Sequence, residues 1–270
     1  MSESRQPKAT VYARIIEHIF FTHYEPGAEE VVFDRSEIAS AARSLGVDVP
    51  KNVGDSIYSF RYRQELPAAI RNAAPPGKAW VIAPAGRSRY KFAAVQPVEI
   101  KPNPAYAETK IPDATPGIIE MYASGDEQAL LAKLRYNRLL DVFTGVACYS
   151  LQSHLRTTVG GCQIETDELY VGVDRRGAHY VFPVQAKAAK ERLGIVQIQQ
   201  DFDMCMVRFP GLICRPIGAQ FMEKDLIALF AFEQGSEGRL MVCAEKHYRL
   251  VSSENLSPEE LATYRDHPFG

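Results

Sequence analysis

The feature that most constrains the fold of this chain is a pair of strand-like segments joined by a short turn. Residues 164–173 and 179–186 are rich in β-branched and aromatic side chains, and Arg175-Arg176-Gly177 between them has the composition of a turn. Runs of this kind predict two antiparallel strands that form a hairpin. A fold for the second half of the chain must therefore include a β-sheet that contains this hairpin.

Four polar residues of the hairpin could meet at one end of it. Side chains alternate across a strand, so Glu165 and Asp167 are expected on one face. For the same reason, Gln185 and Lys187 are expected on one face of the partner strand. If the two faces coincide, two carboxylates, an amide oxygen and an ammonium group converge on one small volume. An ordinary amphipathic hairpin with surface charges is the alternative interpretation.

Such a group of side chains suits the hydrolysis of a phosphodiester bond. Mg²⁺ prefers oxygen ligands, keeps several of its waters and neutralises the charge that develops on a phosphate. We expect Asp167 to be the main metal ligand, assisted by Glu165 and by the side-chain oxygen of Gln185. Lys187 is expected to hold the attacking water or to help deprotonate it, and to offset the phosphate charge.

At these positions the sequence resembles the PD-(D/E)XK nuclease superfamily, which includes restriction endonucleases. Asp167 matches the acid of the first half of the motif, and Gln185-Ala186-Lys187 matches the second half. The similarity extends over residues 127–218, where helical and strand-like segments alternate. The resemblance implies an αβββαβ core with a mixed sheet and catalytic roles for Asp167, Gln185 and Lys187. It also implies Mg²⁺ as the cofactor, which Mn²⁺ can replace.

Position 185 departs from the pattern, because the superfamily prefers Asp or Glu there. A neutral amide still offers an oxygen but removes one negative charge, so metal affinity should fall unless another acid compensates. Asp141, in the helix expected before the hairpin, is the first candidate for that acid, and Glu127 is the second. A solvated helix charge is the alternative for both residues. Pro183 is a second conflict, because proline cannot donate to a strand ladder and prefers sheet edges.

The first 95 residues have a different organisation. Helical periodicity predicts helices over 11–24, 36–45 and 52–74, with a break at Pro67, and short strands are expected over 31–33, 79–83 and 89–95. This order resembles a winged-helix domain, in which the third helix usually enters the major groove of DNA and the wing contacts the backbone. A solvated basic face, or a winged helix used for protein contacts, is the alternative interpretation.

Cationic residues are concentrated in this part of the chain. Between residues 61 and 91 there are seven Lys and Arg residues and a single acid, Glu65, although the formal net charge of the whole chain is -2. This local excess predicts double-stranded DNA as the partner. The residues expected to contact DNA are Asn52, Arg61, Arg63, Arg87, Arg89 and Lys91, with Arg156 of the second domain placed to meet a phosphate.

Prolines divide the chain into two domains. The five prolines between residues 96 and 117 predict a semi-rigid linker between domains at 1–95 and 118–270. The elements predicted after the linker, besides the hairpin, are helices over 118–122, 127–155 and 190–203, strands over 211–217, 225–233 and 238–251, and a short helix near Ser257. The predicted fold class is therefore α/β of the α+β type, with an N-terminal winged helix and a C-terminal restriction-endonuclease-like core.

The remaining composition indicates the compartment. Five cysteines without CxxC spacing lie in apolar surroundings, which indicates buried thiols in a reducing environment and argues against a zinc site. The N-terminal residues show no apolar signal region, and no run approaches 18 apolar residues. We therefore expect a soluble cytoplasmic protein that does not associate with a membrane.

These features together predict a type II-like restriction endonuclease. Cutting both strands of DNA needs two active sites, so a homodimer is expected. Two alternatives stay open. One is a structure-selective nuclease that acts on branched DNA or on RNA, and the other is a non-catalytic DNA-binding regulator with a degenerate nuclease domain.

Overall fold

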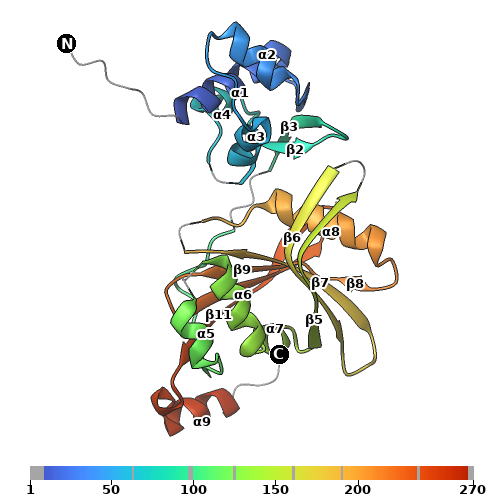
Figure 1. The fold of residues 1–270 in the computed structure, drawn as a ribbon. Coiled ribbons are helices and arrows are strands. Elements are labelled where there is room, and N and C mark those ends of the chain that lie inside the picture. The colour runs from blue at the N-terminus through green and yellow to red at the C-terminus, as the bar shows by residue number, and fades with distance from the viewer. Residues whose placement is uncertain are drawn as a thin grey trace, which may run out of the picture. The chain divides into compact units, whose positions relative to one another are not determined.

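The computed structural model describes residues 9–62, 64–96, 100–123, 126–159, 162–189, 191–235 and 238–266. The chain divides into two compact units, Met1–Glu99 with Thr158–Gln163, and Ile100–Thr157 with Ile164–Gly270. Each unit has its own hydrophobic core and its own β-sheet (Figure 1). None of the described helices is long and apolar enough to cross a membrane.

The first unit packs short helices on a small sheet. Its elements are α1 (Ala9–His23), β1 (Glu30–Asp34), α2 (Glu37–Ser44), α3 (Val53–Tyr62), α4 (Ala68–Asn72), β2 (Ala79–Pro84) and β3 (Arg89–Val95). The three strands are antiparallel in the order β1-β3-β2. Phe20 of α1 packs edge-to-face on Trp80 and Phe92 of the sheet. The order of elements agrees with the sequence prediction, including the break at Pro67 between α3 and α4.

The second unit is built on an eight-stranded mixed sheet. Its elements before the hairpin are β4 (Glu108–Pro112), α5 (Gly117–Tyr122), α6 (Glu127–Tyr136), α7 (Leu139–Thr144) and β5 (Ala147–Val159). The hairpin consists of β6 (Cys162–Val173) and β7 (His179–Lys187). The elements after it are α8 (Ile195–Arg208), β8 (Ile213–Cys214), β9 (Ile217–Phe221), β10 (Leu226–Gln234), β11 (Leu240–Val251), a 3-10 turn (Ser253–Asn255) and α9 (Pro258–Asp266). The strand order is β4-β11-β10-β9-β7-β6-β5, with β8 beside β7.

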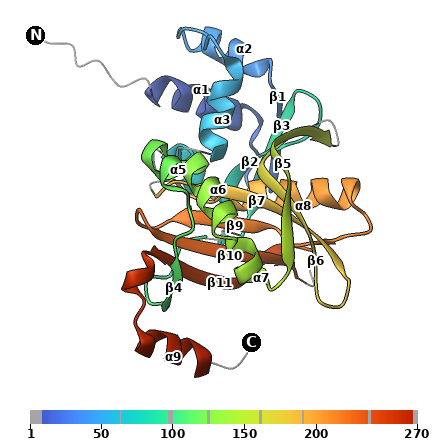
Figure 2. The same cartoon turned by 60° about the horizontal axis from the view of Figure 1, so that its bottom comes forward.

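Helices lie against both faces of the sheet at β7, which runs antiparallel to β6 and parallel to β9. Val184 and Ala186 of β7 belong to a core that also contains the leucines of α6 and α7. Figure 2 shows these two helices in green against the sheet. Gln185 points to the opposite face by strand alternation and contacts Asp201 of α8. The end of β7 therefore lies between two helical layers.

The segment after α7 is a strand, whereas the sequence predicted a helix over 127–155. Gly145 ends α7 in the left-handed conformation, with φ 68°, and β5 then carries His154 and Arg156. Cys148 and Leu155 are the buried residues of β5, and most of the others are exposed. Because β5 is an edge strand, its sequence lacks the regular alternation that would have identified it.

Two proline-containing strands also differ from expectation. β4 lies inside the segment 96–117 that its prolines predicted to be a linker, and it is one of the two edge strands of the sheet, where proline is tolerated. Pro183 is buried in the middle of β7. On one side, β7 pairs with β8 as far as Val181 and with β9 from Val184 onward. On this side of β7, Pro183 therefore lies between the end of the pairing with β8 and the start of the pairing with β9. No strand pairs with it there, so its missing N–H group removes no hydrogen bond between strands.

Candidate active site

The two halves of the predicted motif meet where β6 and β7 separate. The pairing of β6 with β7 extends only as far as Glu168. Beyond it, the backbone N–H of Ala186 donates to Oδ2 of Asp167 at 2.8 Å. Because Ala186 stands between Gln185 and Lys187 in the sequence, this hydrogen bond holds the Asp167 carboxylate against the middle of the second half of the motif.

Lys187 is buried and paired with an acid. It is 8% exposed, and its Nζ donates to Oε1 of Glu127 at 2.5 Å from the start of α6. Burial alone would lower the pKa of Lys187, but the hydrogen bond to Glu127 and the negative charges of Asp167 and Glu127 raise it above its usual value. Lys187 is therefore held in its protonated form beside two carboxylates.

The pKa of the Asp167 carboxyl group is higher than usual. Burial raises its pKa to about 6, although the N–H of Ala186 and the charge of Lys187 favour the ionised form. The negative charge of Glu127 raises the pKa further. The carboxyl group is therefore ionised at neutral pH and loses its charge in mildly acidic solution.

Gln185 belongs to a second, fully buried group of polar side chains. Its Nε2 donates to the backbone oxygen of Glu165 at 3.0 Å and to Oδ2 of Asp201 at 2.7 Å. Oδ1 of Asp201 accepts a hydrogen bond from the hydroxyl group of Thr166 at 2.6 Å. Burial raises the pKa of Asp201 to about 8, and the hydrogen bonds from Thr166 and Gln185 only partly offset this. This group ties both hairpin strands to α8.

Asp201 was not identified from the sequence. A helix over 190–203 was predicted, and the structure buries Ile198 and Phe202 on α8. Asp201 follows Ile198 by three residues and precedes Phe202, so it lies on the same face. An acidic residue among buried positions was the signal available, because a buried charge needs a partner.

Two residues predicted as metal ligands are engaged elsewhere. Glu165 is exposed and accepts hydrogen bonds from Nε and Nη2 of Arg156 on β5 at 3.1 and 2.8 Å. Asp141, on α7, accepts from the N–H of Cys148 at 3.0 Å. Of the two helix acids considered, Glu127, the second candidate, is therefore the one that reaches the buried lysine.

The cations of the predicted wing are partly neutralised within the first unit. Lys91 of β3 pairs with Glu30 of β1, and Nε of Arg89 lies 3.7 Å from Oδ1 of Asp34. Arg87 is exposed in the turn between β2 and β3. The acids of β1 thus offset part of the positive charge that the sequence predicted for DNA binding.

Residues of the predicted recognition helix have mixed roles. Oδ1 of Asn52 accepts from the N–H of Gly54 at 3.1 Å, and its Nδ2 donates to Asp55 at 2.8 Å. Asn52 therefore satisfies a backbone N–H group at the start of α3, which is a structural role. Arg61 is half-buried on α3, and Arg63 lies outside the described residues.

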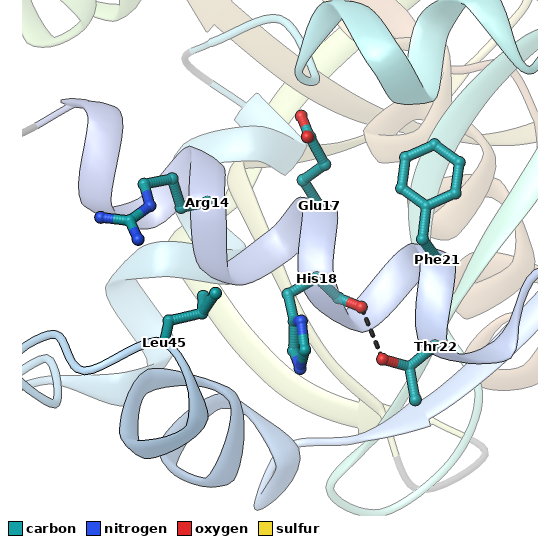
Figure 3. Close-up of a pocket in the computed structure, with 6 residues that line it drawn as sticks. All are labelled: Arg14, Glu17, His18, Phe21, Thr22 and Leu45. Atoms are coloured by element: carbon teal, nitrogen blue, oxygen red, sulfur yellow. Dashed lines mark hydrogen bonds between the residues drawn. The ribbon is translucent and has the colours of Figure 1, made fainter.

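The first unit also carries a surface pocket of ≈ 450 Å³ (Figure 3). The residues that line it are Arg14, Glu17, His18, Phe21, Thr22 and Leu45. None of these six residues is buried, and the hydroxyl group of Thr22 donates to the backbone oxygen of His18 within α1 at 2.7 Å. The pocket therefore presents no buried polar group that would select a ligand.

A metal at the candidate active site would depend on few protein ligands. Within the described residues, no group of three or more His, Cys, Asp or Glu side chains is placed to hold a metal ion. The carboxylates of Glu127 and Asp201 are bound to Lys187 and Gln185. The other oxygen donors at the end of β7 are the Asp167 carboxylate and Oε1 of Gln185, which is buried and accepts no hydrogen bond from the described residues. Two protein oxygens fit a hard cation that retains several waters, such as Mg²⁺.

Comparison with known proteins does not identify a family for this chain. A search of family models, of curated proteins and of solved structures finds no match. The resemblance to the PD-(D/E)XK superfamily therefore stays a prediction, and the function has to be argued from the geometry of the site.

Proposed function

We propose that this protein hydrolyses phosphodiester bonds in nucleic acid with a divalent metal held at the ends of β6 and β7. The observation that carries the proposal is the hydrogen bond from the N–H of Ala186 to Asp167, which joins the two halves of the motif. The chain order supports it, because α6, β5, β6, β7, α8 and β9 follow the αβββαβ scheme, apart from the short elements α7 and β8. β9 also lies parallel to β7 in a mixed sheet.

Each residue of the site has a separate task in this proposal. Asp167 and Oε1 of Gln185 hold the metal, which when bound neutralises phosphate charge and makes a bound water more acidic. Lys187 is protonated, so it holds the attacking water or a phosphate oxygen and does not act as the base. Glu127 fixes the position of Lys187 through their ion pair.

We further propose double-stranded DNA as the substrate and the first unit as the part that binds it. The sheet order β1-β3-β2 and the sequence of helices and strands support a winged-helix arrangement. Arg61 on α3 and Arg87 in the exposed turn would contact the DNA. Arg89 and Lys91 could join them if their ion pairs with Asp34 and Glu30 opened. Double-strand cleavage by a type II-like restriction endonuclease would require a homodimer.

A second candidate function is a DNA-binding regulator whose nuclease-like unit does not cut. Two observations favour it: Lys187 is already paired with Glu127, and position 185 supplies an amide in place of an acid. Fewer negative charges weaken the binding of a divalent cation. Metal-dependent cutting separates the two candidates.

The test is cleavage of unmodified and of cytosine-methylated phage DNA in Mg²⁺ or Mn²⁺. Lys187→Met removes the charge and keeps most of the side-chain length, and Lys246→Met, at an exposed position of β11, is the matched control. We expect discrete, metal-dependent fragments from the wild type and the control, and a rate lower by about 10²-fold or more from Lys187→Met.

The outcomes distinguish the candidates. Equal cleavage by Lys187→Met and the wild type would exclude this site as the source of the activity. Salt-sensitive DNA binding without cleavage of either DNA would favour the regulator. Cleavage limited to branched DNA or to RNA would instead indicate the structure-selective nuclease.

A further inference from the structure

The side-chain amide of Gln185 is held by two hydrogen-bond acceptors. Its Nε2 donates to the backbone oxygen of Glu165 at 3.0 Å and to Oδ2 of Asp201 at 2.7 Å. A backbone carbonyl oxygen can only accept, so the amide atom that faces Glu165 must be the nitrogen. The two contacts therefore select one of the two orientations of the amide.

The oxygen of the same amide is left for another partner. Gln185 is 1% exposed, and among the described residues none donates a hydrogen bond to its Oε1. Buried polar atoms of side chains rarely lack a partner in folded proteins. The orientation selected by Glu165 and Asp201 thus leaves an oxygen lone pair available at the end of β7, which is where the metal is proposed to bind.

Asp201 is itself held in one position. It is 1% exposed, and its Oδ1 accepts a hydrogen bond from the buried hydroxyl group of Thr166 at 2.6 Å. If Asp201 is protonated, the proton can lie on Oδ1, because a hydroxyl group can accept as well as donate. Oδ2 then accepts from Gln185 in both protonation states.

We propose that Asp201 is a positioning residue, which orients the Gln185 amide so that its oxygen and not its nitrogen faces the metal. The inference rests on the proposed metal site and deepens it. It explains how glutamine serves at a position where the motif prefers an acid: an amide has one ligand atom instead of two, so its orientation must be fixed. Without Asp201, one of the two contacts that fix it is lost.

Two substitutions at position 201 separate the orientation of the amide from the charge of the acid. Asp201→Asn retains an oxygen that accepts from Gln185, and its new NH₂ group can donate to the hydroxyl group of Thr166. Asp201→Leu has a similar shape but no acceptor. Asp203→Leu is the matched control, because Asp203 is an exposed acid on the same helix.

Two measurements on the full chain test the inference. The first is solvent exchange of the Gln185 side-chain NH₂ protons by NMR, with the signal assigned through its loss in Gln185→Met. The second is Mn²⁺ affinity by titration. We expect Asp201→Asn and Asp203→Leu to keep slow NH₂ exchange and to bind Mn²⁺ within about twofold of the wild type. Asp201→Leu should lose the protection and bind about tenfold more weakly or worse, as is typical when the residue orienting a ligand is removed.

If the wild type binds Mn²⁺, either of two results would overturn the inference. If Asp201→Asn weakened Mn²⁺ binding as much as Asp201→Leu, the charge of Asp201 and not its orienting contact would matter. If Asp201→Leu kept a protected NH₂ group and normal affinity, the contact would have no such role. Failure of the wild type to bind Mn²⁺ would instead refute the metal site itself, and with it the inference, even where the exchange data confirmed the orientation.

A further variant covers the case in which Asp201→Leu does not fold. The double variant combines Thr166→Val with Asp201→Asn. The asparagine introduced at position 201 then has no hydroxyl group at position 166 to bind, so the orientation of its own amide is no longer fixed. The NH₂ protons of Gln185 should then exchange faster, and Mn²⁺ should bind more weakly, than in Asp201→Asn alone. Identical exchange and affinity in the two proteins would overturn the inference.

Discussion

Gln185→Glu should destabilise the protein, although glutamate is a residue that the PD-(D/E)XK pattern prefers at this position. The wild-type side chain donates to the backbone oxygen of Glu165 and to Oδ2 of Asp201. An ionised carboxylate has nearly the same shape as the amide but can only accept hydrogen bonds. The substitution therefore converts two attractive contacts into two repulsive ones.

The magnitude follows from the two lost hydrogen bonds. Leaving a buried polar group without its partner costs about 1–3 kcal/mol, so the free energy of unfolding should fall by about 2–6 kcal/mol. A proton shared between the new carboxyl group and Asp201 would relieve part of this repulsion. The pKa of the new carboxyl group is therefore expected to be higher in the folded than in the unfolded protein. A raised folded-state pKa means that stability is retained at low pH and lost as the pH rises.

Urea denaturation of the wild type and the variant at about pH 5 and about pH 8 measures both effects. Gln152→Glu, at an exposed position of β5, is the matched control and should change the free energy of unfolding by less than about 0.5 kcal/mol. We expect the deficit of Gln185→Glu to be larger at the higher pH by about 1 kcal/mol or more. A variant as stable as the wild type at both pH values would refute the reasoning, because the two acceptors would then not control position 185.

Other contacts predict measurable effects. Arg135→Met removes the charged partner of the fully buried Glu168, which accepts from Nε and Nη2 at 3.2 and 2.7 Å and keeps, among the described residues, only the Ser150 hydroxyl group. The free energy of unfolding, measured by urea denaturation, should therefore fall by about 1.5–3 kcal/mol, and an unchanged midpoint would contradict this. Because the pKa of Asp167 is about 6, Mn²⁺ affinity should rise as the pH increases through this value and then level off; a flat profile would remove Asp167 from the metal site. Glu30→Gln releases Lys91 from its ion pair. The affinity for a DNA duplex, measured by fluorescence anisotropy, should therefore rise by up to about fivefold. No rise would argue against DNA contact at β3.

The hairpin was predictable because its signals are local. Residues 164–173 and 179–186 fall within β6 and β7, and Gly177 has φ 82°, a conformation that favours glycine in the turn. The contact of Asp167 with the Gln185-Ala186-Lys187 segment follows from the same hairpin, since it joins residues near the ends of adjacent strands. Glu165 lies beyond the pairing of β6 with β7, which ends at Glu168, and its carboxylate binds Arg156 of β5.

Contacts between distant segments could not be predicted in the same way. Lys187 is 60 residues from Glu127, and the choice between Glu127 and Asp141 depends on how α6 packs against the sheet. Asp201 reaches Thr166 over 35 residues, although its place on the buried face of α8 could have been recognised. β5 was mistaken for helix because an exposed edge strand does not need alternating apolar residues.

The polar groups at the end of β7 should move independently of one another, because they are anchored to different elements. The backbone of β7 holds Asp167, α6 holds Lys187 through Glu127, and α8 holds Gln185 through Asp201. Proteins open locally, with a different free energy for each element. A fluctuation that separates α8 from the sheet would therefore free the amide while the lysine stays fixed, and a fluctuation of α6 would do the reverse. On warming, Gln185 and Lys187 should therefore lose their fixed positions one at a time, in the order in which α8 and α6 separate from the sheet.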